Sequence, residues 1–364
     1  MKRRFLVPVI AFLAFGGLLS VDILDEIWGG LPDPGCITPH HERDEPLRIE
    51  LWQGVEQTFG ERGIPQEWYN IQGRVDARWG VSTLSYTLNN RPRQPLSIGA
   101  SERRLACEGD FNIEIPTSQL TPGPNQITIT AIDRHGNQIQ QTISLKFIAD
   151  QVWPLPYAVD WDQVSDSSKA VQIVDGQWAL TADGIRTKTI SYDRAIVVGD
   201  LSWENYEITV PFIIHSVNPI ESPSNGAGLG IIVHWNGHSD EPIVCEQPRC
   251  GWWDKSATAW YGWDEYGRST GLLLSGYNDT PLAKDLNMEL ELGTWYDLRL
   301  SVDTSMANAG EHYRLKIWPS TALEPQTWTL IGEQPFGRPE SGSLLLVAHH
   351  VDITFGNLEI TTLP

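Results

Sequence analysis

Alternating apolar and polar residues fill most of the chain, and this two-residue period confines it to β-structure. Runs such as QITITAI and QTISLKF alternate over about 5–7 residues, as strands with one buried face do. Longer runs follow towards the C-terminus, among them YEITVPFIIH and TWYDLRLSVD. None of these has the 3.6-residue apolar period of an amphipathic helix. The chain is therefore predicted to be all-β.

Turn sequences and a proline-rich segment divide the runs into two regions. Between residues 47 and 150 the runs are short, and LNNRP, TPGPN and RHGN separate them. This arrangement predicts a small antiparallel β-sandwich. The segment WPLP, residues 153–156, marks the boundary. The longer runs of residues 151–364 predict a second sandwich, a jelly roll of two packed sheets.

The first residues have the layout of a secretory signal. Lys2, Arg3 and Arg4 precede an apolar run that extends from Phe5 to Leu19 without a charge. Residues 1–20 are therefore predicted to be a signal peptide or, if uncleaved, an N-terminal anchor. Residues 21–46 are rich in Pro, Gly and charge, which predicts a linker. The protein is expected outside the cell or at the cell envelope, with membrane contact only through an uncleaved N-terminal segment.

The overall charge argues against nucleic acid as a partner. The chain has 26 Lys and Arg against 46 Asp and Glu, a formal net charge of -20. Binding to phosphate backbones depends on clustered Lys and Arg. The same acidity opposes attraction to an anionic membrane surface.

Four cysteines fit an exported protein with disulfides. Cys245 and Cys250 bracket the short loop EQPR and are predicted to pair with each other. A bond between Cys36 and Cys107 would tie the N-terminal segment to the first region. A zinc site is the alternative, but the sequence has no CxxC motif, and the nearest histidine to the 245–250 pair is His238.

The first region resembles bacterial immunoglobulin-like domains. The similarity is carried by DFNIEIPTSQLTPGPNQITITAIDRHGNQIQQTISLKF, in which the corner Leu120–Asn125 precedes the strand ITITA. The resemblance covers roughly residues 47–147 and implies a fold rather than an activity. Such domains usually act as spacers or adhesive modules.

The second region resembles the concanavalin A-like lectin/glucanase superfamily, close to laminin-G-type modules. WENYEITVPFIIH, GTWYDLRLSVD, YRLKIW and GSLLLVAHHVDITFGNLEI carry this similarity, in that order. Glucanases of the superfamily have two close catalytic carboxylates in an E-x-D-x-E type of motif, as retaining hydrolysis requires. That motif is missing here. Glu204 with Glu207, and Glu289 with Glu291, are better explained as solvated edge residues, so hydrolysis of that type is not expected.

Strand parity predicts which side chains face away from the second core. Tyr296, Leu298, Leu300 and Val302 share one face of their run, and Tyr206 to Ile214 alternate in the same way. Many lectin-like sandwiches bind ligands on a polar sheet face that carries an aromatic ring. The outward residues predicted to form such a face are His215, His234, Arg299, Lys316, Trp318 and one of His349 and His350. The alternative is that these charges pair across an exposed sheet.

The stretch GWWDKSATAWYGWDEYGR, residues 251–268, holds four tryptophans and two tyrosines. Aromatic faces stack on the apolar side of a sugar ring, and neighbouring polar groups bind its hydroxyls. In a strand TAWYGW, Tyr261 and Trp263 share one face and Trp260 takes the other. The predicted sugar-binding residues of this stretch are Trp252, Trp253, Trp260, Trp263 and Asp264. The alternative is that loop rings cap one end of the sandwich.

The sequence is also compatible with calcium binding, because hard oxygen ligands are abundant. The candidate ligands are Asp303, Asn308 and Asp352. The loop DTSMANAG lacks the spacing of an EF-hand loop, so no site is claimed.

Three functions are compatible with these patterns. The first is an exported bacterial protein that binds carbohydrate or another cell-surface ligand without catalysis. The second is a glycoside hydrolase or polysaccharide lyase, which would need acid–base groups among His215, His234, Arg299 and His350. The third is a structural or adhesive protein that binds other proteins.

Overall fold

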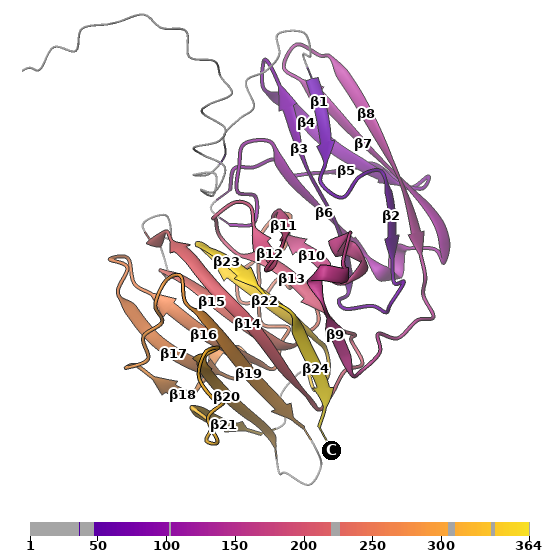
Figure 1. Ribbon diagram of the computed structural model, residues 1–364. Helices are drawn as coiled ribbons and strands as arrows, with labels where there is room; N and C mark the ends of the chain where they lie inside the picture. The colour runs from indigo at the N-terminus through magenta and orange to yellow at the C-terminus, as the bar shows by residue number, and fades with distance from the viewer. Residues whose placement is uncertain are drawn as a thin grey trace, which may run out of the picture. The chain divides into compact units, whose positions relative to one another are not determined.

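The computed structural model describes Cys36 and residues 47–101, 103–219, 226–304, 310–335 and 339–363 (Figure 1). These residues form strands and short 3-10 turns, and no α-helix occurs among them. The all-β prediction is confirmed. Within the same ranges, no helical segment has the length and apolar character that crossing a membrane requires. The predicted signal or anchor, and the linker apart from Cys36, lie outside the described residues.

The first sandwich packs a three-stranded sheet against a five-stranded sheet around its own core. Ile71, Ile113, Ile127 and Ile143 are buried in this core, in line with the alternation of their strands. The immunoglobulin-like assignment of this sandwich stays a prediction. The three-stranded sheet has the order β1 (Leu47–Leu51), β3 (Trp68–Ala77) and β6 (Asp110–Pro116). The five-stranded sheet has the order β2 (Glu56–Phe59), β8 (Gln138–Phe147), β7 (Gly123–Asp133), β4 (Val81–Leu88) and β5 (Gln94–Pro95).

The second sandwich consists of a seven-stranded and a nine-stranded sheet. The seven-stranded sheet has the order β10 (Gln172–Asp175), β13 (Arg194–Val198), β22 (Ser343–His349), β15 (Ala227–Trp235), β16 (Ala257–Trp263), β17 (Ser269–Ser275) and β18 (Pro281–Asp285). The nine-stranded sheet has the order β11 (Trp178–Thr181), β12 (Gly184–Thr187), β23 (Val351–Phe355), β14 (Tyr206–Val217), β19 (Trp295–Asp303), β20 (Glu311–Pro319) and β21 (Leu330–Gln334), with β24 (Leu358–Thr362) and β9 (Tyr157–Val159) joined through β14.

The core between these two sheets follows the predicted parity. β14 and β19 pair antiparallel with Tyr206 opposite Val302 and Phe212 opposite Tyr296. Every second residue of both strands is buried in one large cluster. The inward faces of these strands are therefore the ones predicted from the sequence.

His234 is an exception, because a bulge reverses the parity near the end of β15. The register shifts between Val233 and Trp235, and His234 has a φ of 50°. The ring of His234 is buried, and its centroid lies 5.6 Å from that of the core residue Tyr206. Trp235 turns to the outer face of the sheet. The prediction that His234 faces outward is wrong. Burial lowers the pKa of His234 to about 3, so the ring is neutral in the folded protein.

Both predicted disulfides are present. Cys36 is bonded to Cys107 across 71 residues, and Cys245 to Cys250 across five. Closing the longer loop restricts the unfolded chain and is worth about 4 kcal/mol by the chain-entropy relation. The shorter bond holds a loop that lies between β15 and β16 and contacts the first sandwich.

Arg104 joins the two sandwiches through a buried charge network. Its guanidinium donates to Asp175 Oδ1 at 2.8 Å and also to Glu114 Oε1 and to the carbonyl of Arg249. Asp175 Oδ2 is 3.1 Å from His238 Nε2, and Glu114 Oε2 accepts from the backbone N–H of Arg249. Burial alone raises the pKa of Asp175, but Arg104 and His238 outweigh it and hold that pKa below its usual value.

We expect Asp175→Asn to destabilise the protein by about 3–5 kcal/mol near neutral pH, because the substitution leaves Arg104 under-compensated in a buried site. Since folding lowers the pKa of Asp175, its contribution is complete above the ordinary aspartate pKa of about 3.9 and is lost as the pH falls through the folded pKa. Urea denaturation at several pH values measures this.

Glu50→Gln is the control, because the side chain of Glu50 forms an exposed ion pair with Arg48. Equal losses of unfolding free energy in the two variants would contradict the role given to the buried network.

Candidate functional site

Glycines line part of the outer face of the seven-stranded sheet. Leu229 and Ile231 of β15 point into the core, so Gly228 and Gly230 face outward. Across the strands, Gly228 lies opposite Gly262, and Gly262 opposite Gly271. At these three positions the strands contribute no side chain to the outer face of the sheet.

The indole of Trp260 lies flat over two of the outward glycines. A Cβ on Gly228 would come within 2.3 Å of Trp260 Cζ2, and a Cβ on Gly230 within 2.7 Å of Trp260 Cε3. The ring therefore covers both positions with one face on the sheet. Trp260 is only half-buried, so part of the ring stays open to solvent. We use the name Trp260 platform for the indole of Trp260 together with Gly228 and Gly230, which it covers.

Tyr192, Asp193 and His349 border one side of the Trp260 platform. His349 is opposite Gly228 in the register, and its ring is 5.8 Å from that of Trp260. His349 Nδ1 is 2.7 Å from Asp193 Oδ1, and its ring packs edge-on to Tyr192 at 4.9 Å. Burial and the charge of Asp193 raise the pKa of Tyr192, so its hydroxyl stays protonated. His349 and Asp193 are buried, whereas Tyr192 is partly exposed on this side of the ring.

The loop before β16 approaches the same face. Trp252 packs against the apolar cluster on which Trp260 also rests, and its ring is 4.4 Å from that of His238. Trp253 Nε1 donates to Asp279 Oδ2 at 3.1 Å, and Lys255 Nζ is 2.6 Å from Asp279 Oδ1. Burial lowers the pKa of Lys255, and Asp279 opposes this shift. Asp279 thus holds the half-buried Trp253 in place.

Several of the predicted site residues meet here. Trp252 and Trp260 share one face, and the ring of His350 is 4.6 Å from that of His349. Burial and His349 lower the pKa of His350 to about 4, so this side chain is neutral near pH 7. Tyr192, Asp193 and Lys255 were not predicted. The alternating glycines of GLGIIV are the sequence signal that could have indicated the platform.

Two other residues of the tryptophan-rich stretch have structural roles. Trp263 is buried in the core, 4.8 Å from the ring of Tyr261, so the prediction that it binds a ligand is wrong. Asp264 accepts from the backbone N–H groups of Tyr266 and Arg268 and pairs with the Arg268 side chain. It stabilises the turn between β16 and β17.

The remaining predicted residues lie on the nine-stranded sheet, so the predicted single face is split between two sheets. Arg299 and Lys316 are directly opposite each other, and both pair with Glu324, at 2.7 and 2.6 Å. Lys316 Nζ also lies 5.7 Å from the ring of Trp318. His215 Nε2 is 2.8 Å from Thr354 Oγ1. This is the alternative in which charges pair across a sheet.

The calcium candidates cannot share one ion. Asp303 follows Val302, which is opposite Tyr206 on β14, whereas Asp352 is opposite Ser216. Ten residues of strand separate these positions, or about 33 Å. Asp352 is also engaged by Arg186 at 2.6 and 2.8 Å. Asn308 lies outside the described residues. Among those that are described, no group of three or more His, Cys, Asp or Glu could hold a metal ion.

Comparison with known proteins gives only distant structural similarity. The sequence matches no protein-family model and no curated protein. Among solved structures, the exoplasmic/lumenal domain of VIP36 in its Ca2+/Man3GlcNAc-bound form is 10% identical, with 57% of this chain and 91% of that chain covered and a TM-score of 0.39. The potassium-bound carbohydrate recognition domain of Emp46p is 10% identical, with coverages of 56% and 96% and a TM-score of 0.39. Winged bean acidic lectin is 10% identical, with coverages of 57% and 99% and a TM-score of 0.34. At these scores the similarity carries no inference about function.

Gly230→Ala tests the packing of the Trp260 platform. The new Cβ must push the indole away from the sheet, and we expect a loss of about 1–3 kcal/mol in unfolding free energy, as for other overpacked sites. In a Trp260→Ala background the same substitution has room and should cost nothing. A double-mutant cycle from urea denaturation measures the coupling between the two sites. Equal costs in both backgrounds would mean that Trp260 does not rest on Gly230.

Proposed function

We propose that this protein is an exported carbohydrate-binding protein without catalytic activity, and that a glycan stacks on the Trp260 platform. The observation that carries the proposal is the partly exposed Trp260, whose indole packs over Gly228 and Gly230. An aromatic face presented in this way suits the apolar C–H side of a sugar ring. Tyr192, which is partly exposed and packs against His349, supplies a polar group on this side.

The charges near the Trp260 platform favour a neutral glycan. Asp193 is held by His349, and Asp279 by Lys255 and Trp253. Lys255 is itself buried, so its charge is not offered to a ligand. Neither a strongly acidic nor a strongly basic partner has a matching cluster among these residues.

The distribution of acid–base groups argues for binding rather than turnover. The hydrolase or lyase alternative needed acid–base groups from among His215, His234, Arg299 and His350. His234 is in the core, His350 borders the seven-stranded sheet, and His215 and Arg299 are on the nine-stranded sheet. Glu289 and Glu291 are exposed before β19. The two disulfides support export, because such bonds persist in oxidising compartments.

A glycan array probed with the full chain, with and without calcium, tests the proposal. We expect neutral glycans to bind, and Trp260→Ala to weaken binding about tenfold or more, which is ~1.4 kcal/mol or more. This is the scale of one aromatic stacking contact. Trp79→Ala is the matched control, because Trp79 is a partly exposed tryptophan of the first sandwich. Thermal melts establish that both variants are folded.

Three outcomes would count against the proposal. Binding that is lost equally in both variants would place the site elsewhere. Release of product from a bound glycan would favour the hydrolase or lyase alternative. No glycan binding under any condition would favour the structural or adhesive protein.

A further inference from the structure

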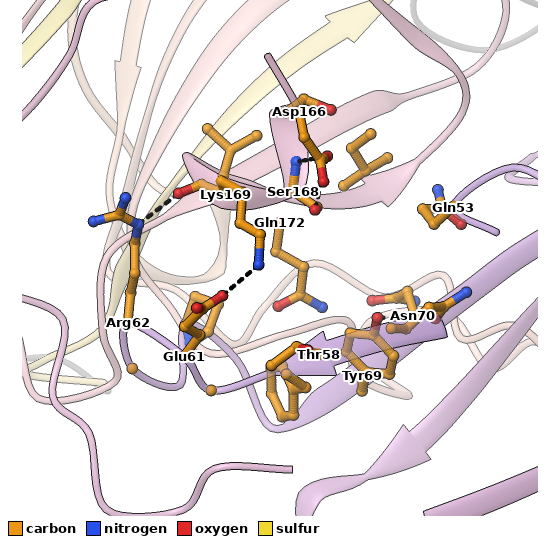
Figure 2. Close-up of a pocket in the computed structure, with 18 of the residues that line it drawn as sticks. Gln53, Thr58, Glu61, Arg62, Tyr69, Asn70, Asp166, Ser168, Lys169 and Gln172 are labelled. Atoms are coloured by element: carbon orange, nitrogen blue, oxygen red, sulfur yellow. Dashed lines mark hydrogen bonds and ion pairs between the residues drawn. The ribbon is translucent and has the colours of Figure 1, made fainter. Parts of the chain in front are cut away.

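A cavity of about 370 Å³ lies between the two sandwiches (Figure 2). Gln53, Thr58 and Tyr69 line it from the first sandwich, and Ser168 and Gln172 from the second. All described residues from Asp33 onward form one compact unit, so both walls belong to the same body. The volume is within the range of small-molecule sites, ~300–1,000 Å³.

This cavity is separate from the Trp260 platform. Gln172 begins β10, and β10 is four strands away from β16 in the sheet order. At about 4.8 Å between neighbouring strands, the two strands lie ~19 Å apart. A ligand in the cavity therefore needs no contact with Trp260.

Three polar atoms of the lining have no hydrogen-bond partner in the part of the chain that the structure describes. They are the indole Nε1 of Trp153 and the amide oxygens of Gln53 and Gln172. Trp153 is only 5% exposed. Buried polar groups are nearly always satisfied, by protein or by a bound molecule. All three atoms have less than 1 Å² of accessible surface, so they lie behind the surface that an occupant of the cavity would touch.

The rest of the lining is aromatic or held in place. Phe59, Tyr69 and Trp178 are buried rings of the wall. Tyr69 Oη donates to Gln57 Oε1 at 2.9 Å, and Asn70 accepts from Gln66 at 2.7 Å and donates to Asn112 at 3.0 Å. These bonds fix the amides and rings before any ligand arrives. Rigid rings with fixed amides suit a molecule that has both apolar faces and hydroxyl groups.

The charged side chains of the lining nearly balance, with Glu56, Glu61 and Asp166 against Arg62 and Lys169. Lys169 Nζ is 2.7 Å from Glu61 Oε2, and Arg62 Nε donates to the carbonyl of Lys169 at 2.5 Å (Figure 2). Asp166 accepts from the backbone and side chain of Ser168. An anionic ligand would have to compete for these cations, whereas a neutral ligand would not.

We infer that this cavity is a second ligand site, which takes a small neutral polyhydroxy molecule, a free sugar. Hydroxyl groups of the sugar form hydrogen bonds with the amide groups of Gln53 and Gln172, and its C–H faces contact the surrounding rings. The inference does not rest on glycan binding at the Trp260 platform.

Isothermal titration calorimetry of the full chain with D-glucose, D-galactose, D-mannose and maltose tests this site. We expect at least one sugar to bind with a one-to-one stoichiometry in the Trp260→Ala variant. Gln172→Leu removes one amide group, and binding should weaken about tenfold or more. Ser168→Trp fills the cavity from an exposed position and should abolish binding while the melting temperature is kept.

The variants separate this inference from the proposed function. Binding that survives Trp260→Ala and is lost in Ser168→Trp supports the cavity, whatever the glycan array shows. Binding that is lost in Trp260→Ala and kept in Ser168→Trp belongs to the platform and overturns the inference. Absence of binding by all four sugars also overturns it and leaves the cavity to water. If Gln172→Leu does not fold, Ser168→Trp alone decides.

Discussion

Arg104 contacts three parts of the chain at once, and the arrangement of both candidate sites depends on it. Its buried guanidinium meets Glu114 of the first sandwich, Asp175 at the end of β10 and the carbonyl of Arg249 in the loop before β16. A buried arginine is costly unless its hydrogen bonds are met. Here two carboxylates and a carbonyl accept from Nε and Nη1, while Nη2 has no partner among the described residues. Arg194 donates to the carbonyl of Arg104 from a further strand. The network therefore fixes one sandwich against the other.

The loop before β16 connects the Arg104 network to the surface of the seven-stranded sheet. Arg249 is bound to Glu114, and His238 to Asp175, so both ends of the loop are attached to the network. His238 in turn packs against Trp252. The position of Trp252 over the seven-stranded sheet is thus coupled to the contact between the sandwiches. The cavity depends on the same contact, because its two walls come from different sandwiches.

The sequence predicts the parts that follow from local periodicity and fails where periodicity breaks. Alternation correctly assigned the inward residues of β14, β19 and β20, because these strands are regular. It failed at His234, because a bulge shifts the register by one residue. Strand parity also predicts which face of a strand a residue occupies, but it does not predict to which sheet that strand belongs. Arg299 and His234 were therefore placed on one surface although β19 and β15 belong to different sheets. The cavity was out of reach, because Gln53 and Gln172 are far apart in sequence and meet only through tertiary packing.

The most direct test of glycan stacking on Trp260 is an NMR titration that follows the indole N–H signals of the full chain. The signal of Trp260 is identified by its absence from the spectrum of Trp260→Phe. With a glycan selected from the array, this signal should shift the most, and the signal of Trp253 should shift less. Shifts confined to Trp79 or Trp318, with Trp260 unchanged, would contradict the proposal that the ring on Gly228 and Gly230 is the binding surface.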